Sequence, residues 1–176
     1  MTAPGTDGAP APTAANRPPR WVTLMALQLA LGVVLAVTWL ALGTWITSMG
    51  LANEARDGSS LSVAMLYVIG LTGLFFAIAS IVVVVMTWRA RTVALASAAE
   101  GDLIPPRQLI TAGWVAVAVH APPVILEVRL MFGDSGVGGL MPLLIAIDVV
   151  AAAVGAWLVV TCKKERRLID GPAEQK

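Results

Sequence analysis

Charged residues are scarce in this chain of 176 residues: they make up 13% of it, while apolar residues make up 57%. A soluble domain carries roughly 25% charged residues, which keep it in solution. The net charge is only +1, so no basic excess indicates nucleic acid as a partner. This composition excludes a water-soluble globule and leaves too few polar residues for a separate catalytic or nucleic-acid-binding domain.

Side chains that bind metals and cofactors are equally rare. Cys162 is the single cysteine, which excludes an intramolecular disulfide, a CxxC redox pair and a zinc site built from cysteines. His120 is the single histidine, so this chain alone cannot give a haem two histidine ligands. The motifs GxSxG and HExxH and the phosphate-binding P-loop are missing as well. We therefore expect neither a metal nor another cofactor, and no enzymatic activity.

Four long apolar runs occupy most of the chain. A helix needs about 20 apolar residues to cross roughly 30 Å of hydrocarbon at 1.5 Å per residue. The runs are rich in Leu, Val, Ala and Ile, and they lack the alternation that is typical of membrane β-strands. The sequence predicts an all-α polytopic membrane protein, a four-transmembrane-helix bundle with spans at about 21–49, 61–88, 109–131 and 137–162.

The segments outside the spans are short and carry most of the basic residues. Residues 1–20 are rich in Pro, Ala, Gly and Thr and are expected to form a disordered tail. Ten of the twelve Lys and Arg residues lie in the two terminal tails and between the second and third spans. The positive-inside rule therefore predicts that both termini are cytoplasmic.

The fourth span is followed by a basic C-terminal tail at residues 163–176. We interpret its first residues as a solvated charge run that sets the topology and lies close to anionic lipid. The basic residues of this run are Lys163, Lys164, Arg166 and Arg167.

The segment between the third and fourth spans, Gly133 to Gly139, contains a pattern similar to GxSG without a catalytic histidine after it. We interpret this segment as a flexible loop.

Small residues spaced by four mark faces on which membrane helices pack closely. We interpret these faces as contacts within the bundle. In a bundle of four helices much of each helix also faces outward, so some of these faces can receive a helix of another protein. The pairs are Gly32 with Ala36, Gly73 with Ala77, Ala151 with Gly155, and Ala152 with Ala156.

Ionisable residues inside the spans form a predicted intramembrane polar cluster. Each costs several kcal/mol at mid-membrane unless it is satisfied. His120 and Asp148 lie near the middle of the third and fourth spans, which are antiparallel neighbours, so we expect them at the same depth. Glu127 follows His120 by seven residues, which is two turns on the same face and about 10 Å further out. Tyr67 lies at a depth where its hydroxyl is expected to reach Glu127.

Pro122 and Pro123 are expected to kink the third helix between His120 and Glu127, because proline removes a backbone donor and clashes with the preceding turn. Two interpretations of this region stay open. In the first, the backbone carbonyls that lose their helical hydrogen bonds lie beside the polar cluster and are suited to a cation or proton pathway. Alternatively, the histidine and the aspartate only lock two helices in register.

Only a small part of the chain lies outside the predicted spans, and this favours a non-catalytic role. We expect a small accessory or structural subunit of a larger bacterial inner-membrane complex for transport or respiration. Its partners would be membrane lipid and other integral membrane subunits. The alternative is a small transporter or proton/cation pathway, working as a homo-oligomer, that uses Asp148, His120 and Glu127. The frequent Ala, Val and Arg residues are typical of high-GC bacterial genomes, which suggests the cytoplasmic membrane of a bacterium.

Overall fold

The computed structural model describes residues 19–99, 104–131 and 141–170, and every regular element in these ranges is an α-helix. Each of the helices is long and apolar enough to span a membrane. The predicted all-α class with four such helices is therefore confirmed. The helices are α1 (Arg20–Asp57), α2 (Leu61–Ala99), α3 (Arg107–Met131) and α4 (Met141–Asp170).

Part of what the sequence predicts lies outside the described residues. Residues 1–18 of the N-terminal tail, the segment Gly133 to Gly139 and residues 171–176 belong to this part. The predicted disorder of the tail and flexibility of the loop stay predictions.

Local sequence explains where helices begin and end. Gly58 follows α1 with a φ of 78°, a conformation that glycine adopts without a steric penalty. Its N–H donates a hydrogen bond to the carbonyl of Glu54. Pro105 and Pro106 directly precede Arg107, the first residue of α3. Prolines are tolerated there because the first N–H groups of a helix have no helical acceptor.

Three helices extend beyond the predicted spans. α1 continues past Met49, α2 continues past Trp88 to Ala99, and α4 continues past Cys162 to Asp170. The predicted spans follow hydrophobicity, whereas helix propagation needs only helix-forming residues. Polar segments such as NEAR in α1 and KKERR in α4 supply them.

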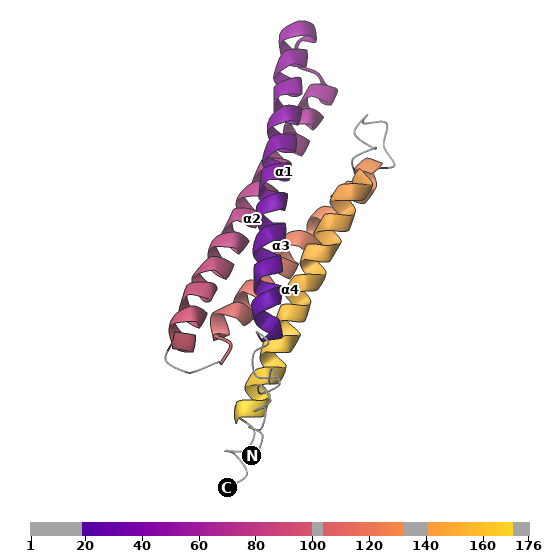
Figure 1. The fold of residues 1–176 in the computed structure, drawn as a ribbon. Coiled ribbons are helices and arrows are strands. Elements are labelled where there is room, and N and C mark those ends of the chain that lie inside the picture. Colours follow the sequence, from indigo (N-terminus) through magenta and orange to yellow (C-terminus); the bar gives the residue numbers. More distant parts are fainter. Residues whose placement is uncertain (1–18, 100–103, 132–140, 171–176) are drawn as a thin grey trace, which may run out of the picture.

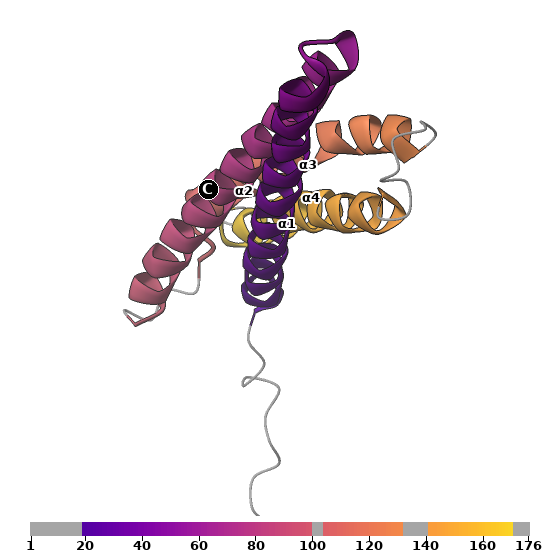
Figure 2. The ribbon, with the colours of Figure 1, turned by 90° about the horizontal axis from the view of Figure 1, so that it is seen from above.

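The helices form two antiparallel hairpins, α1 with α2 and α3 with α4 (Figure 1). Contacts within each hairpin are far more extensive than the contacts that join α1 to α4 and α2 to α3. The hairpins cross each other when seen from above, and they diverge toward the end where α1 meets α2 (Figure 2). The predicted polar cluster lies where the two hairpins meet.

We call the end of the bundle where α1 begins and α4 ends the basic end. Of the described Lys and Arg side chains, only Arg56 lies at the opposite end. The side chains at the basic end are Arg20, Arg89, Arg91, Arg107, Lys163, Lys164, Arg166 and Arg167.

Glycines bring α1 and α2 into backbone contact. A Cβ atom on Gly43 would lie 2.8 Å from the backbone N of Leu74, and one on Gly70 would lie 2.9 Å from the backbone N of Thr47. A Cβ on Gly73 would lie 3.1 Å from the Cα of Gly43. Because no larger side chain fits at these distances, the three glycines set the spacing of the hairpin.

Two groups of buried apolar residues hold the hairpins together. The larger group lies at the basic end, draws on all four helices, and includes Trp21, Leu109 and Leu158. The second group lies deeper and contains Leu35, Trp39, Ala77 and Ala151, from α1, α2 and α4. Trp39 also belongs to the polar site, so apolar packing and the site share a residue.

Candidate functional site

A contact between two glycines fixes the register of α3 against α4. A Cβ atom on Gly113 would lie 2.7 Å from the carbonyl oxygen of Gly155, and one on Gly155 would lie 2.9 Å from the carbonyl oxygen of Gly113. His120 follows Gly113 by seven residues, and Asp148 precedes Gly155 by seven residues. Seven residues are two helical turns, so the two side chains face each other at one level of the antiparallel pair.

His120 and Asp148 form a buried polar pair. The Nδ1 atom of His120 lies 2.9 Å from the Oδ1 atom of Asp148, and the side chains are 1% and 0% exposed, respectively. The structure thus brings together the two residues that depth alone predicts to be neighbours.

Trp39 joins this pair from the other hairpin. Its indole Nε1 donates a hydrogen bond of 3.3 Å to the Oδ2 atom of Asp148, and both side chains are buried. Both oxygens of Asp148 therefore have a partner. Sequence reasoning missed Trp39 because a tryptophan inside a span usually only fills space. Its position near the middle of the first span, at the depth of His120, was the available signal.

Glu127 is the third ionisable member of the cluster. Its side chain is completely buried, and its carboxylate interacts electrostatically with that of Asp148. Because Cα–Cβ bonds tilt toward the N-terminus of a helix, antiparallel α3 and α4 direct Glu127 and Asp148 toward each other, which closes much of the offset between them. Among the described residues, neither oxygen of Glu127 nor the Nε2 atom of His120 has a hydrogen-bond partner.

Tyr67 lies away from this cluster. Its hydroxyl donates a hydrogen bond of 2.6 Å to the Oε2 atom of Glu54 in an exposed position. The predicted hydrogen bond between Tyr67 and Glu127 is therefore wrong. The α1–α2 hairpin diverges from the α3–α4 hairpin at this end (Figure 1), so equal depth did not mean lateral proximity.

Pro122 and Pro123 lie inside α3, which continues through both of them. Pro123 is buried, whereas Pro122 is exposed. Since proline has no N–H, the carbonyls of Ala118 and Val119 lose their usual helical donors. Both residues lie within one turn of His120; Ala118 is exposed and Val119 is half-buried.

The predicted small-residue faces fall into two groups. Ala152 is half-buried and Ala156 is exposed, so this pair lies on the outer side of α4. The closest backbone contacts involve Gly43, Gly70 and Gly113, which sequence reasoning missed because no glycine or alanine lies four positions away from them. The predicted small residues that are buried are Gly32, Ala36, Gly73, Ala77, Ala151 and Gly155.

The predicted basic run lies on the last turns of α4. The Nζ atom of Lys163 lies 5.7 Å from the ring centroid of Trp114, and the Nη1 atom of Arg166 donates a hydrogen bond of 3.4 Å to the carbonyl of Pro105. These contacts join the end of α4 to the start of α3. Lys163, Lys164 and Arg167 are exposed, while Arg166 is half-buried.

An apolar groove lies between α1 and α4, on the side where the hairpins diverge. It has a volume of about 440 Å³ and is lined by residues of α1 between Val37 and Trp45 and of α4 between Leu143 and Ile147. Ile147 directly precedes Asp148, and Trp39 lies within the α1 segment that lines the groove. Trp39 and Asp148 themselves do not line the groove.

Three further buried polar side chains lie on the α1–α2 hairpin: Thr87, which donates a hydrogen bond to the carbonyl of Val83, and the pair Gln28 and Ser80. Gln28 and Ser80 are 0% and 1% exposed, and their side-chain polar atoms have no hydrogen-bond partner among the described residues. Gln28 lies closer to the basic end than Trp39 does, by eleven positions of α1. Both residues therefore add polar atoms to the interior outside the cluster.

The described ranges contain no group of three or more His, Cys, Asp and Glu residues arranged to hold a metal ion. No protein-family model, curated protein or solved structure matches this chain.

Proposed function

We propose that this chain is a small membrane transport protein that binds and releases a proton at His120, Asp148 and Glu127. Glu127 carries this proposal, because its side chain is completely buried and lies close to a second carboxylate, that of Asp148. A histidine and an aspartate are enough to fix two helices in register. A second acid inside a membrane adds an energetic cost, and such residues are typical of proton and ion pathways.

The charges of the cluster favour a proton as the bound species. Two adjacent carboxylates repel each other strongly in an interior of low dielectric constant. The cluster is neutral when His120 is protonated, Asp148 is ionised and Glu127 is protonated. Release of the proton from Glu127 leaves one net negative charge, which the next proton neutralises. The cluster then has two states that differ by one proton.

The surroundings of the cluster support access from both ends of the bundle. On the side where the hairpins diverge, the groove between α1 and α4 extends to Ile147, the residue before Asp148. Toward the basic end, Gln28 and Ser80 provide buried polar atoms without a partner among the described residues. A proton pathway needs such groups, because each step requires a donor or an acceptor within hydrogen-bond reach.

Proton movement into reconstituted vesicles tests the proposal. A potassium diffusion potential drives protons inward, and a pH-sensitive dye in the lumen measures the rate of acidification. The wild-type protein is expected to acidify the lumen faster than protein-free vesicles do. Glu127→Gln keeps the size of the side chain and removes its exchangeable proton, so its rate should equal that of protein-free vesicles.

Glu54→Gln is the matched control, because Glu54 is an exposed acid at the tip of the α1–α2 hairpin. This variant carries the same chemical change and should acidify the lumen at the wild-type rate. Equal rates for Glu127→Gln and the wild type would contradict the proposal.

A second function is favoured by the outer side of α4, where Ala156 is exposed and Ala152 is half-buried. A small-residue face of this kind admits a helix of another protein at close range. The chain would then be an accessory subunit of a larger complex in the bacterial inner membrane, with both termini cytoplasmic. Purification from the native membrane in gentle detergent, followed by mass spectrometry, tests this alternative. Stoichiometric larger subunits would support it, whereas a lone monomer or homo-oligomer would count against it.

A further inference from the structure

We infer that an exposed groove between α1 and α2 binds one phospholipid, with its phosphate on Arg91 and an acyl chain along the helices. We call this the α1–α2 groove: it lies between Val22–Val33 of α1 and Val84–Arg91 of α2 and has a volume of about 490 Å³. The inference concerns a surface remote from the polar cluster and does not depend on the proposed function.

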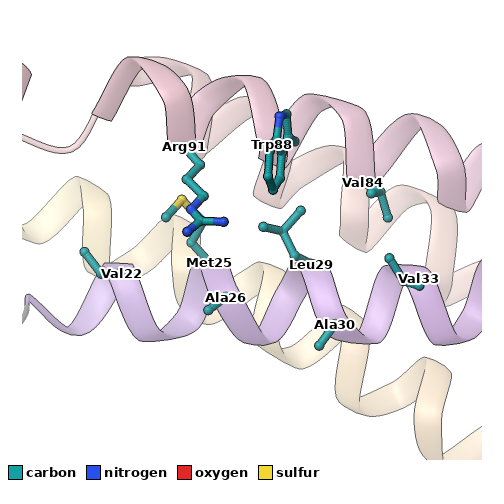
Figure 3. A pocket seen from close by; sticks show the side chains of 9 residues that line it. All are labelled: Val22, Met25, Ala26, Leu29, Ala30, Val33, Val84, Trp88 and Arg91. Atoms are coloured by element: carbon teal, nitrogen blue, oxygen red, sulfur yellow. The ribbon is translucent and has the colours of Figure 1, made fainter. Parts of the chain in front are cut away.

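The residues of the α1–α2 groove are arranged by polarity along its length. Among the described residues, Arg91 is the only charged one that lines it, and the other lining residues are apolar or aromatic. Figure 3 shows the guanidinium of Arg91 reaching from α2 toward α1 beside Trp88, while Val33 and Val84 lie toward the other end of the groove. A phospholipid has the same order of polarity, from a phosphate to a hydrocarbon chain.

A second pocket continues the apolar end of the groove. It has a volume of about 230 Å³, shares Val33 and Val84 with the first pocket, and extends to Leu40 of α1. From Val22 to Leu40, α1 rises about 27 Å at 1.5 Å per residue. The hydrocarbon core of a bilayer is roughly 30 Å thick, so the acyl chains of one leaflet span about 15 Å. The two pockets together are therefore long enough for the headgroup region and one acyl chain.

The position of Arg91 suits a lipid phosphate. Its Cζ atom lies 5.2 Å from the ring centroid of Trp88, which is 55% exposed, as expected of an indole at the membrane–water interface. Stacking on the ring holds the guanidinium plane and leaves its N–H edge to form paired hydrogen bonds with phosphate oxygens. Arg20 lies at the same basic end and raises the local positive potential.

The phosphate contact is tested by titrating the purified full-length protein with dioleoylphosphatidylglycerol and counting bound lipid by native mass spectrometry. Arg91→Gln should weaken binding about tenfold, as expected for the loss of a charged hydrogen-bond partner. Arg89→Gln is the matched control: it removes an exposed charge two positions away, and it should bind with the wild-type affinity. Dioleoylglycerol, which has the same chains without the phosphate, should bind to the wild type as weakly as phosphatidylglycerol binds to Arg91→Gln.

The acyl-chain contact is tested by filling the groove. Ala30 lines it and is exposed, so Ala30→Phe should abolish binding of the lipid without disturbing the core. Ala153→Phe, at an exposed position of α4, should leave binding unchanged. Binding by Arg91→Gln and Ala30→Phe equal to that of their controls would overturn the inference. So would a wild-type dimer that Ala30→Phe converts to a monomer with unchanged lipid content, because a second copy of the chain would then cover the groove.

Discussion

Asp148 connects the members of the polar cluster, because it contacts each of the others. One of its oxygens lies against His120, the other accepts a hydrogen bond from Trp39, and its charge acts on Glu127. Three helices therefore depend on one side chain. Replacing it separates the role of its shape from the role of its charge.

Asp148→Asn should retain the fold but not proton transport. The amide oxygen can accept the hydrogen bond from Trp39 while the amide nitrogen donates to the Nδ1 atom of neutral His120, so we expect a loss of about 1 kcal/mol or less in the free energy of unfolding. Asp148→Leu leaves both partners buried and unsatisfied, so we expect a loss of about 3 kcal/mol. Denaturant unfolding in detergent measures the stabilities, and the vesicle assay measures transport. Equal losses of stability in the two variants would show that the hydrogen bonds of Asp148 do not hold the helices.

Exchanging the two residues is a complementary experiment. In the double variant His120→Asp with Asp148→His, the acid and the base change helices but stay opposite each other across the Gly113–Gly155 register. We expect this variant to regain much of the stability that Asp148→Leu loses, as measured by the same unfolding experiment. A double variant no more stable than Asp148→Leu would mean that the pair contributes only in its native orientation, with Trp39 as a required partner.

The sequence allowed part of this cluster to be predicted. His120 and Asp148 were accessible because adjacent antiparallel spans place residues by depth, and a short connection limits their lateral separation. Trp39 and Tyr67 were not, because their partners depend on how the two hairpins sit against each other. Hydrophobicity along one helix contains no information about that arrangement. The contact of Trp39 with Asp148 and that of Tyr67 with Glu54 both follow from it.

Among the helices, backbone contact at glycines determines which surfaces meet. The number and approximate position of the helices followed from the four apolar runs, since length and hydrophobicity dominate there. The spacing of small residues predicted one side of each close contact, at Gly73 and Gly155. It did not predict the facing glycines, Gly43 and Gly113, because neither has a glycine or an alanine four positions away. In both hairpins, glycines on facing helices meet and allow the close approach.

Gly43→Ala should destabilise the α1–α2 hairpin. The added methyl group would lie 2.8 Å from the backbone N of Leu74, so the helices must separate, and we expect a loss of about 2 kcal/mol. Gly50→Ala is the control in the same helix, because its nearest contact is the flexible ring of Tyr67 at 3.4 Å. Alanine also has the better helix propensity, so this variant should unfold at or above the wild-type denaturant concentration. A Gly43→Ala variant as stable as Gly50→Ala would contradict the role given to backbone contact.

For the whole molecule, the distribution of basic side chains predicts an orientation in the membrane. Reporter fusions after Lys176 and between Gly58 and Ser60 should show opposite sidedness, with the C-terminal fusion in the cytoplasm. The second site is placed there because α1 continues to Asp57, and an insertion before that residue would disrupt the helix. The same sidedness for both fusions would rule out four crossings.

The unequal contacts within and between the hairpins have a consequence for biogenesis. Each hairpin buries its own glycine contact, so each is complete as a unit of membrane insertion once its second helix has left the ribosome. Two separately encoded fragments, divided between Ala99 and Arg107, should therefore insert independently and assemble when they are co-expressed. Trp39 would come from one fragment and Asp148 from the other, so recovery of proton transport would report correct docking of the halves. Fragments that are degraded even when they are produced together would instead indicate that the two hairpins assemble only when they are covalently connected.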